Sequence, residues 1–222
     1  MPDLEPFLLS LQFASMATLG IVALGVPTAL VLARGRFFGK GLLVGLLLLP
    51  LVLPPTVLGY VLLQILGRAG PVGGWLERAF GIRLVFNGVG AVIASGVAAF
   101  PMFLVPARSA IEGVDPALED AARLLGRGEW SVFASVTLPL AWRGIVAGAV
   151  LAFARALGDF GATLMVASDI PGRTRTASLA IYNAVLLGDN ARAWMLTLLV
   201  AGVSMAALLV AQRTALSPGA RR

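Results

Sequence analysis

Long apolar stretches separated by short polar segments dominate the sequence. A helix needs about 20 mostly apolar residues to cross roughly 30 Å of hydrocarbon, and five stretches approach or exceed that length. They are Phe7–Ala33, Gly41–Leu66, Val89–Pro106, Ile145–Ala167 and Ala193–Gln212. The segments 67–88 and 168–192 are long enough to hold a short re-entrant or sixth helix. The pattern therefore predicts an all-α integral membrane protein with five transmembrane helices, or six if one of these segments also crosses.

Composition supports a membrane location and removes most catalytic chemistry. Of the 222 residues, 59% are hydrophobic and 13% are charged, whereas soluble domains have about 45–50% apolar and about 25% charged residues. Cysteine and histidine are both absent, which excludes disulfides, thiol nucleophiles, zinc sites built from these residues and histidine general bases. We therefore expect one transmembrane domain over residues 1–222, with no catalytic or metal-binding residues.

The basic residues favour one orientation in the membrane. The net charge of +6 arises from residues scattered between apolar stretches, so we expect no nucleic acid partner. Ten Arg and Lys follow the first, third and fifth stretches, and six lie in the segments on the other side. Because cytoplasmic segments carry the excess, the N-terminus is predicted outside and the C-terminus in the cytoplasm. Acidic Asp3 and Glu5 stand where a signal peptide would be basic, so the first stretch is expected to be a retained span.

The polar segment 107–143, which this orientation places in the cytoplasm, contains two predicted short helices. Asp115 followed by proline is a helix start, because the carboxylate accepts an orphan backbone N–H and proline fits the first turn. The first helix should end near Leu125, with Gly126 as its C-terminal cap. The second should run from Trp130 to about Thr137 and end at the following Leu-Pro pair. Such a pair of helices either joins two spans at the membrane surface or presents a surface to a protein partner, and composition does not decide between these roles.

Within this segment the residues resemble the cytoplasmic coupling loop of ABC importer permeases. That signature reads Glu-Ala-Ala, three residues, Gly, nine residues, Ile-x-Leu-Pro. The matching positions are Asp120, Ala121, Ala122, Gly126, Val136, Leu138 and Pro139. A second acid, Glu119, directly precedes the first of them. Asp120 replaces the usual Glu, and Val136 replaces Ile. The resemblance implies a type I ABC importer permease whose loop docks into a cleft on a cytoplasmic ATPase.

A second resemblance concerns the substrate. The stretch from Phe153 to Asp189 is similar to molybdate-type permeases, above all at Ile170-Pro171-Gly172-Arg173-Thr174, and Pro50–Gly59 points the same way. Sulfate and thiosulfate permeases share the Gly-Asp-Phe-Gly pattern at 158–161 but are generally longer. The resemblance therefore implies an importer of molybdate or the similar oxyanion tungstate. A sulfate or thiosulfate permease is the alternative, and a passive anion channel is a weaker one.

Charged and polar residues inside the apolar stretches are candidates for the translocation path or gate. Arg155 and Asp159 are four residues apart, so they share one helix face and can pair. A lone charge at the centre of a membrane helix costs about 2.5–3.5 kcal/mol, so pairing or a wet cavity is required. Either the two residues face the path or a dimer seam, or they form an internal clamp. Thr56, beside the proline cluster of the second stretch, and Thr163 complete the candidates.

The resemblance also implies the partners. No phosphate-binding GxxxxGK[ST] sequence occurs, so ATP and magnesium should be used by a separate subunit, and this chain should bind no cofactor. One copy is too small to enclose a pathway, so we expect a homodimer with two cytoplasmic ATP-binding subunits, surrounded by membrane lipid. An external substrate-binding protein should meet the outer loops, for which Arg68–Arg83 and Arg173–Arg192 are candidates.

Overall fold

The structure, a computed structural model, describes residues 4–215. It is built from helices, and no strand occurs within that range, which confirms the all-α prediction. The helices are α1 (Glu5–Arg34), α2 (Lys40–Val52), α3 (Pro55–Leu66), α4 (Pro71–Phe80), α5 (Gly88–Glu112), α6 (Pro116–Leu124), α7 (Glu129–Val132), the π-helical segment η1 (Phe133–Thr137), α8 (Leu138–Leu157), α9 (Gly161–Ala167), α10 (Ala177–Leu186) and α11 (Asn190–Ala215).

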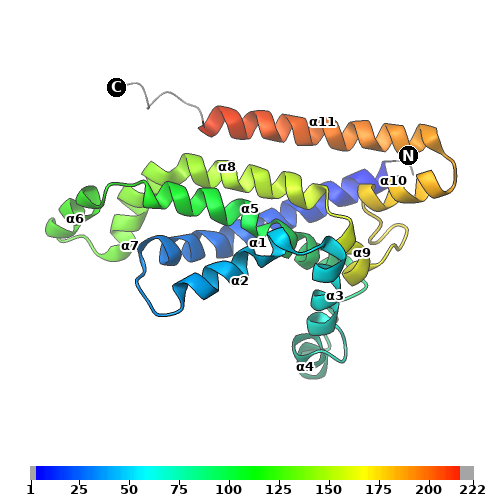
Figure 1. The fold of residues 1–222 in the computed structure, drawn as a ribbon, viewed down its shortest axis with the longest axis horizontal. Helices are drawn as coiled ribbons and strands as arrows, with labels where there is room; N and C mark the ends of the chain where they lie inside the picture. The colour runs from blue at the N-terminus through cyan, green and yellow to red at the C-terminus, as the bar shows by residue number, and fades with distance from the viewer. Residues whose placement is uncertain (1–3, 216–222) are drawn as a thin grey trace.

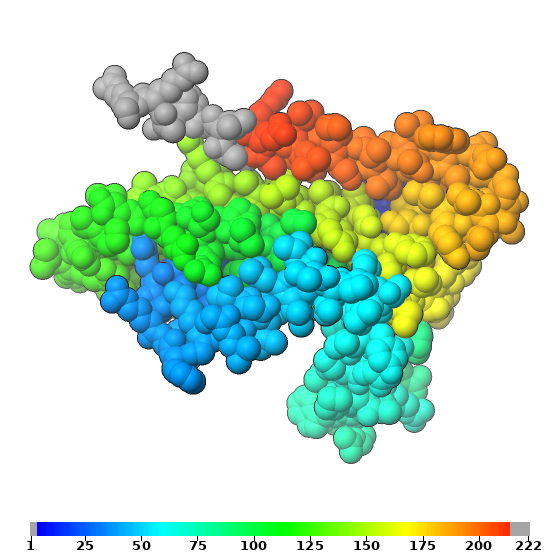
Figure 2. Space-filling view, in the orientation of Figure 1, coloured from blue at the N-terminus to red at the C-terminus, as the bar shows by residue number. Residues whose placement is uncertain are grey.

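Three long helices, α1, α5 and α8, pack side by side and form the centre of the molecule (Figure 1). Leu32 of α1, three large apolar residues of α5 and Leu157 of α8 are fully or almost fully buried in one core. Helix α11 lies along α8, the short helices α6 and α7 lie at one end, and α9 and α10 lie at the other. Helices α3 and α4 project sideways from the bundle (Figures 1 and 2).

Four helical segments are long and apolar enough to cross a membrane, and a bent pair makes a fifth. The four are Glu5–Arg34, Gly88–Glu112, Glu129–Leu157 and Asn190–Arg213. The long connections hold α4 and α10, each of 10 residues. Both are far shorter than the roughly 20 residues that a span needs. The prediction of five spans is therefore consistent with the fold, and neither connection adds a sixth.

The second predicted span, Gly41–Leu66, is not one straight helix, because it is broken at its proline cluster. Helix α2 ends with the N–H of Leu53 bonded to the carbonyl of Leu49, and the next helical segment leaves at a bend of 119°. Pro54 and Pro55 follow directly. Neither proline can donate a backbone hydrogen bond, and each disfavours the helical conformation in the residue before it, so the helix restarts in a new direction.

The fourth predicted span, Ile145–Ala167, is also broken. Helix α8 ends at Leu157, and α9 begins at Gly161 after a short non-helical link. In that link lies Asp159, whose carboxylate accepts the N–H of Thr163 at 2.9 Å. A carboxylate that captures backbone N–H groups starts a helix, so this residue supports a second helix instead of continuing the first.

The third span is longer than predicted, because Pro101 and Pro106 lie inside α5 without ending it. The helix continues to Glu112 and fills the first part of segment 107–143. Both prolines face α8 or the core: Pro101 is buried, and the ring of Pro106 would lie 3.1 Å from a Cβ added at Gly148. Packing against this glycine of the neighbouring helix provides room for the ring of Pro106.

The second coupling-loop helix does not stop at Leu138-Pro139, contrary to the prediction. Helix α7 continues through the π-helical turn η1 into α8, so residues 129–157 form one helical segment. The N–H of Leu138 bonds to the carbonyl of Phe133, five residues back. This widened turn places Pro139, which has no N–H to offer, in the first turn of α8, where none is needed.

Close contact between α5 and α8 depends on two glycines of α8. A Cβ at Gly144 would lie 2.3 Å from the Cβ of Ala110, and a Cβ at Gly148 would lie 2.9 Å from the carbonyl oxygen of Phe103. Small residues let helix backbones approach where lipid supplies no hydrophobic driving force. The two glycines therefore set the distance between the central helices.

We predict that Gly148→Val destabilises the subunit by about 1–3 kcal/mol, the usual cost of overpacking a tight contact. The same change at Gly202 of α11, where nothing lies within 4 Å of an added Cβ, is the control. Thermal unfolding of the purified protein in detergent, followed by tryptophan fluorescence, measures the difference. Equal unfolding temperatures for the two variants would contradict the packing argument.

Candidate functional site

The coupling loop has the first helix that the sequence predicts. The Asp115 carboxylate accepts the N–H of Ala117 at 2.9 Å, and α6 runs from Pro116 to Leu124. Gly126 adopts a φ of +82°, a left-handed conformation that residues with a Cβ rarely adopt. The chain thus reverses at this glycine and enters α7.

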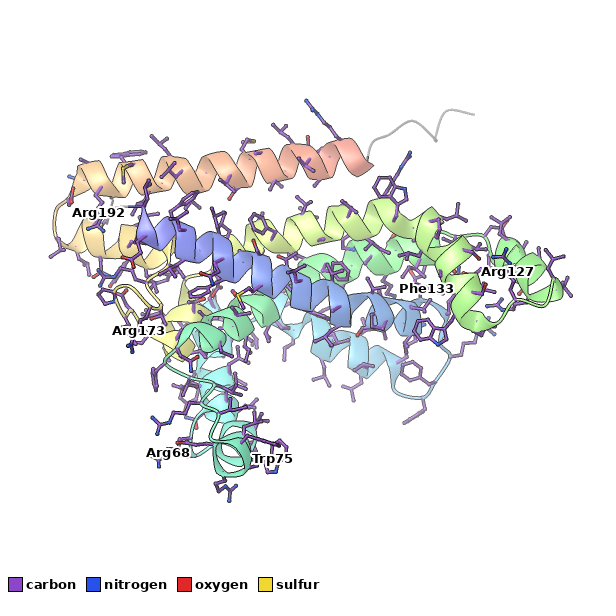
Figure 3. All side chains as sticks on the ribbon, turned by 180° about the vertical axis from the view of Figure 1, so that it is seen from behind. Arg68, Trp75, Arg127, Phe133, Arg173 and Arg192 are labelled. Carbon is purple, nitrogen blue, oxygen red and sulfur yellow. The ribbon has the colours of Figure 1, made fainter. Side chains whose placement is uncertain are left out.

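The far end of this loop presents large apolar side chains to solvent. Side chains of α6, of the turn after it and of α7 form a patch, which we call the coupling patch. Its members are Leu118, Leu124, Leu125 and Trp130. Figure 3 shows Arg127 at the tip of the same end, away from the helical bundle. An exposed apolar patch at the polar end of a membrane protein is typical of a site for a protein partner.

The two adjacent acids of the loop point in different directions. Asp120 is exposed, with 68% of its side chain accessible, and it accepts a hydrogen bond from Arg123 at 2.7 Å. Arg123 also donates to Glu129 at 2.8 Å and so fastens α6 to α7. The hydrogen bonds that Arg123 donates, first to Glu129 and then to Asp120, raise the pKa of its guanidinium above the ordinary value. The other motif residues divide similarly: Ala121 and Pro139 are exposed, whereas Ala122 is buried and Leu138 is half-buried.

Glu119, by contrast, faces the interior and is 3% exposed. Its Oε1 accepts hydrogen bonds from the guanidinium of Arg34 at 3.0 Å and from the hydroxyl of Thr137 at 2.7 Å. Arg34 also donates to the carbonyl of Val114 at 2.9 Å. An unsatisfied buried polar group costs about 1–3 kcal/mol or more when charged, so these partners are what allows the carboxylate to be buried. No local pattern identifies Arg34 and Thr137 as its partners, because they lie 85 and 18 residues away along the chain.

The two helix breaks lie against each other. A Cβ added at Gly161, the first residue of α9, would lie 2.8 Å from the Cβ of Pro55 and 3.3 Å from the backbone nitrogen of Thr56. One turn along, a Cβ at Gly59 would lie 3.0 Å from the Cα of Ala162. Helices α3 and α9 are therefore held together by glycines at both turns. Thr56, a candidate gate residue, is exposed at the start of α3.

Asp159 and Thr163 form an internal pair. Asp159 is 2% exposed, and one carboxylate oxygen accepts both the N–H and the hydroxyl of Thr163, at 2.9 and 2.7 Å. The other oxygen accepts from Arg155 at 3.2 Å, so the predicted pairing of these two charges is present. Arg155 itself keeps 30% of its side chain accessible. The geometry is that of a clamp for Asp159 and Thr163, and it leaves the half-buried Arg155 and the exposed Thr56 as the accessible candidate residues.

At the opposite end from the coupling loop, a cavity of about 590 Å³ separates α3 and α4 from the start of α5. Arg68, Glu77, Arg83 and Asn87 are among its lining residues. The Glu77 carboxylate forms ion pairs with Arg83 at 3.0 Å and with Arg68 at 3.5 Å. In Figure 3, Arg68, in the turn between α3 and α4, and Trp75, on α4, lie well apart from Arg127. This end is therefore hollowed, and both charged and apolar residues line the hollow.

The segment after α9 is a rigid loop at this same end. Arg175 makes two hydrogen bonds to the Asp169 carboxylate, at 2.7 and 2.9 Å. The hydroxyl of Thr174, which is fully buried, donates to the carbonyl of Ser168 and accepts the N–H of Ile170. These bonds leave Arg173 exposed at the surface, where Figure 3 shows it pointing outward. The loop thus presents one arginine of the Pro-Gly-Arg-Thr stretch and buries its neighbour.

Solved structures share this arrangement of helices. A bacterial ABC transporter involved in the import of the acidic polysaccharide alginate matches with a TM-score of 0.71 and 17% identity, over 96% of this chain and 77% of that one. An amino acid ABC transporter matches with a TM-score of 0.59 and 16% identity, over 97% and 92% of the two chains. At these identities the likeness shows the fold, which is that of type I ABC importer permeases.

Sequence relatives cover nearly the whole chain. The molybdenum transport system permease protein ModB of Escherichia coli K12 is 46% identical over 212 residues, 95% of this chain and 93% of the relative. The putative molybdenum transport system permease protein YvgM of Bacillus subtilis is 39% identical over 94% of this chain and 92% of the relative. The profile described as binding-protein-dependent transport system inner membrane component matches residues 22–222. The chain therefore belongs to the family of binding-protein-dependent transport system inner membrane components, and it is a multi-pass permease subunit of an ABC importer.

Proposed function

We propose that this permease subunit imports molybdate across the cytoplasmic membrane by alternating access, with tungstate as a close analogue. The observation that carries the proposal is the 46% identity to the molybdenum permease of Escherichia coli over 95% of the chain. The ordered loop that presents Arg173 belongs to the stretch by which the sequence resembles molybdate permeases. Sulfate and thiosulfate, which are also tetrahedral dianions, are the competing substrates.

The working assembly contains two copies of this subunit, two ATP-binding subunits and an external binding protein. A single copy leaves α2 without a buried residue, and one face of α11 is exposed along its length. A second copy and lipid are the partners that an apolar surface within a membrane accepts. ATP and magnesium are used by the ATP-binding subunits, and this chain is neither an enzyme nor a cofactor carrier.

The coupling-loop end lies in the cytoplasm, and the end with the 590 Å³ cavity lies outside. The bias of Arg and Lys toward the segments at the coupling-loop end supports this orientation, because cytoplasmic segments carry the excess. Helix α1 then begins outside, and α11 ends in the cytoplasm. The coupling patch meets the ATPase, and the cavity lined by Arg68 and Arg83 faces the binding protein.

Arg155 and Thr56 are the residues that we assign to the translocation path, at the junction of the two helix breaks. Asp159 forms an ion pair with the Arg155 guanidinium at 3.2 Å. Because the carboxylate offsets the positive charge, the transported anion meets a weaker positive potential. A permease must release its cargo, and a strong cationic site would retain it. Asp159 and Thr163 fix the geometry of the break.

Uptake into liposomes is the direct test of the substrate. The chain is reconstituted with its ATPase and binding protein, and molybdate influx is measured with and without ATP and in the presence of tungstate or excess sulfate. We expect ATP-dependent uptake that tungstate blocks and sulfate does not. Competition by sulfate would identify a sulfate permease, and influx without ATP would contradict an importer.

A charge placed in the coupling patch tests the ATPase contact. Leu124 is 89% exposed, and Leu124→Glu should weaken binding of the ATPase at least about tenfold, because burial of a carboxylate in an apolar contact is unfavourable. The control is Leu187→Glu, the same change at an 83% exposed leucine of the opposite end. Co-purification of the ATPase is the measurement. Equal recovery with both variants would exclude the patch as the docking site.

A change at the helix break tests the proposed path. Arg155→Gln removes the positive charge, and we expect molybdate uptake to fall about tenfold, the effect of about 1.4 kcal/mol on the barrier, while Arg155→Lys retains most activity. Arg36→Gln, at an exposed arginine near the coupling end, is the matched control. The measurement is the rate of molybdate uptake by each variant at fixed concentrations of ATP and binding protein. An unchanged rate in Arg155→Gln would remove this residue from the path.

A further inference from the structure

Three separate parts of the fold converge on one buried carboxylate, that of Glu119. Arg34 is the last residue of α1, Glu119 lies on α6, and Thr137 is the last residue of η1. Both partners bond the same oxygen, at 3.0 and 2.7 Å. Glu119 and Thr137 are almost fully buried. We call these three residues the coupling clamp.

The clamp is distinct from the coupling patch. The patch and Asp120 face solvent, whereas Glu119 lies on the opposite face of α6. The hydrogen bonds of Arg123 to Asp120 and Glu129 stay within the loop and hold α6 to α7. The clamp bonds instead lead from α6 into two of the three central helices of the bundle, α1 directly and α8 through η1.

The π-helical turn lies where this link enters α8. Thr137 is its last residue, and the following N–H, of Leu138, bonds five residues back to Phe133. π-helical turns are rare and are frequently found at functional sites. A displaced α6 would therefore pull on α8 at a widened turn and on α1 at its last residue, where Arg34 also bonds the carbonyl of Val114 at 2.9 Å.

We infer that Glu119 is the positioning residue that transmits movement of the ATPase-bound coupling helix to α1 and α8. The inference rests on the proposed function of an ATP-driven importer. Of the two adjacent acids in the loop motif, Asp120 belongs to the exposed surface and Glu119 to the mechanical link. Removal of the clamp should leave docking and ATP hydrolysis in place and should separate them from transport.

The test uses the complete transporter in liposomes, with Glu119→Gln compared to Glu112→Gln. Glu112 makes an exposed ion pair with Arg108 inside α5, at 2.7 Å, so the control breaks an ion pair by the same chemical change. We expect Glu119→Gln to assemble with the ATPase and hydrolyse ATP within twofold of wild type, while molybdate uptake per ATP falls about tenfold. The control should keep the wild-type ratio. Loss of assembly, a parallel fall of hydrolysis and uptake, or an unchanged ratio would each overturn the inference.

A double-mutant cycle separates a clamp from independent effects. If Arg34 and Glu119 act through their contact, the variant carrying both Arg34→Gln and Glu119→Gln should lose no more uptake per ATP than the worse single variant. Multiplying losses would show that the residues act separately and would overturn the inference.

A readout that needs no substrate distinguishes failure of the clamp from failure of the proposed function. The natural chain has no cysteine, so Phe38→Cys and Ala117→Cys, both at exposed positions, place spin labels beside the end of α1 and on α6. With labelled subunits diluted by unlabelled ones, the distance distribution should stay narrow with and without ATP, and Glu119→Gln should broaden it. An identical distribution in the variant would overturn the clamp, even if wild-type uptake of molybdate is absent and the proposed substrate is wrong.

Discussion

A chain that crosses a bilayer must satisfy its backbone N–H and C=O groups within the protein, because hydrocarbon offers them no partners. The breaks between α2 and α3 and between α8 and α9 meet this demand in different ways. At the break between α2 and α3, the prolines have no backbone N–H, so they leave no donor without a hydrogen-bond partner. At the second, the Asp159 carboxylate accepts the N–H of Thr163, and Arg155 balances its charge. Both breaks are then packed against each other through Gly161.

The same constraint explains why small residues are so prominent between the helices. Lipid tails are as apolar as leucine, so helices in a membrane gain little from hiding apolar side chains and depend on close packing. Gly144 and Gly148 bring α8 onto α5, and Gly59 brings α3 onto α9. The apolar side chains that a soluble protein would bury are correspondingly exposed on α2 and α11. These surfaces are available to lipid and to a second copy of the subunit.

The two buried carboxylates of the described residues lie where the fold supplies partners. Glu119 and Asp159 are both almost fully buried, and each accepts bonds from an arginine and a threonine. One lies at the junction of the coupling loop with the bundle, and the other at a helix break near the proposed path. A permease driven from the cytoplasm needs a firm connection at the first place and a defined geometry at the second. The two carboxylates provide them by the same chemistry.

The sequence by itself determined the membrane environment, the approximate number and positions of the spans, and the first coupling helix. Each of these depends on local properties: the length of apolar stretches, the cap that Asp115 provides, and the positive φ that Gly126 permits. Only the tertiary structure decided how far the helices continue through prolines. Pro106 does not end α5, and a glycine of α8 leaves room for its ring. The tertiary structure also decided that Arg34 and Thr137 are the partners of Glu119. Those contacts join residues distant in the chain, and their free energy depends on burial that no local pattern reports.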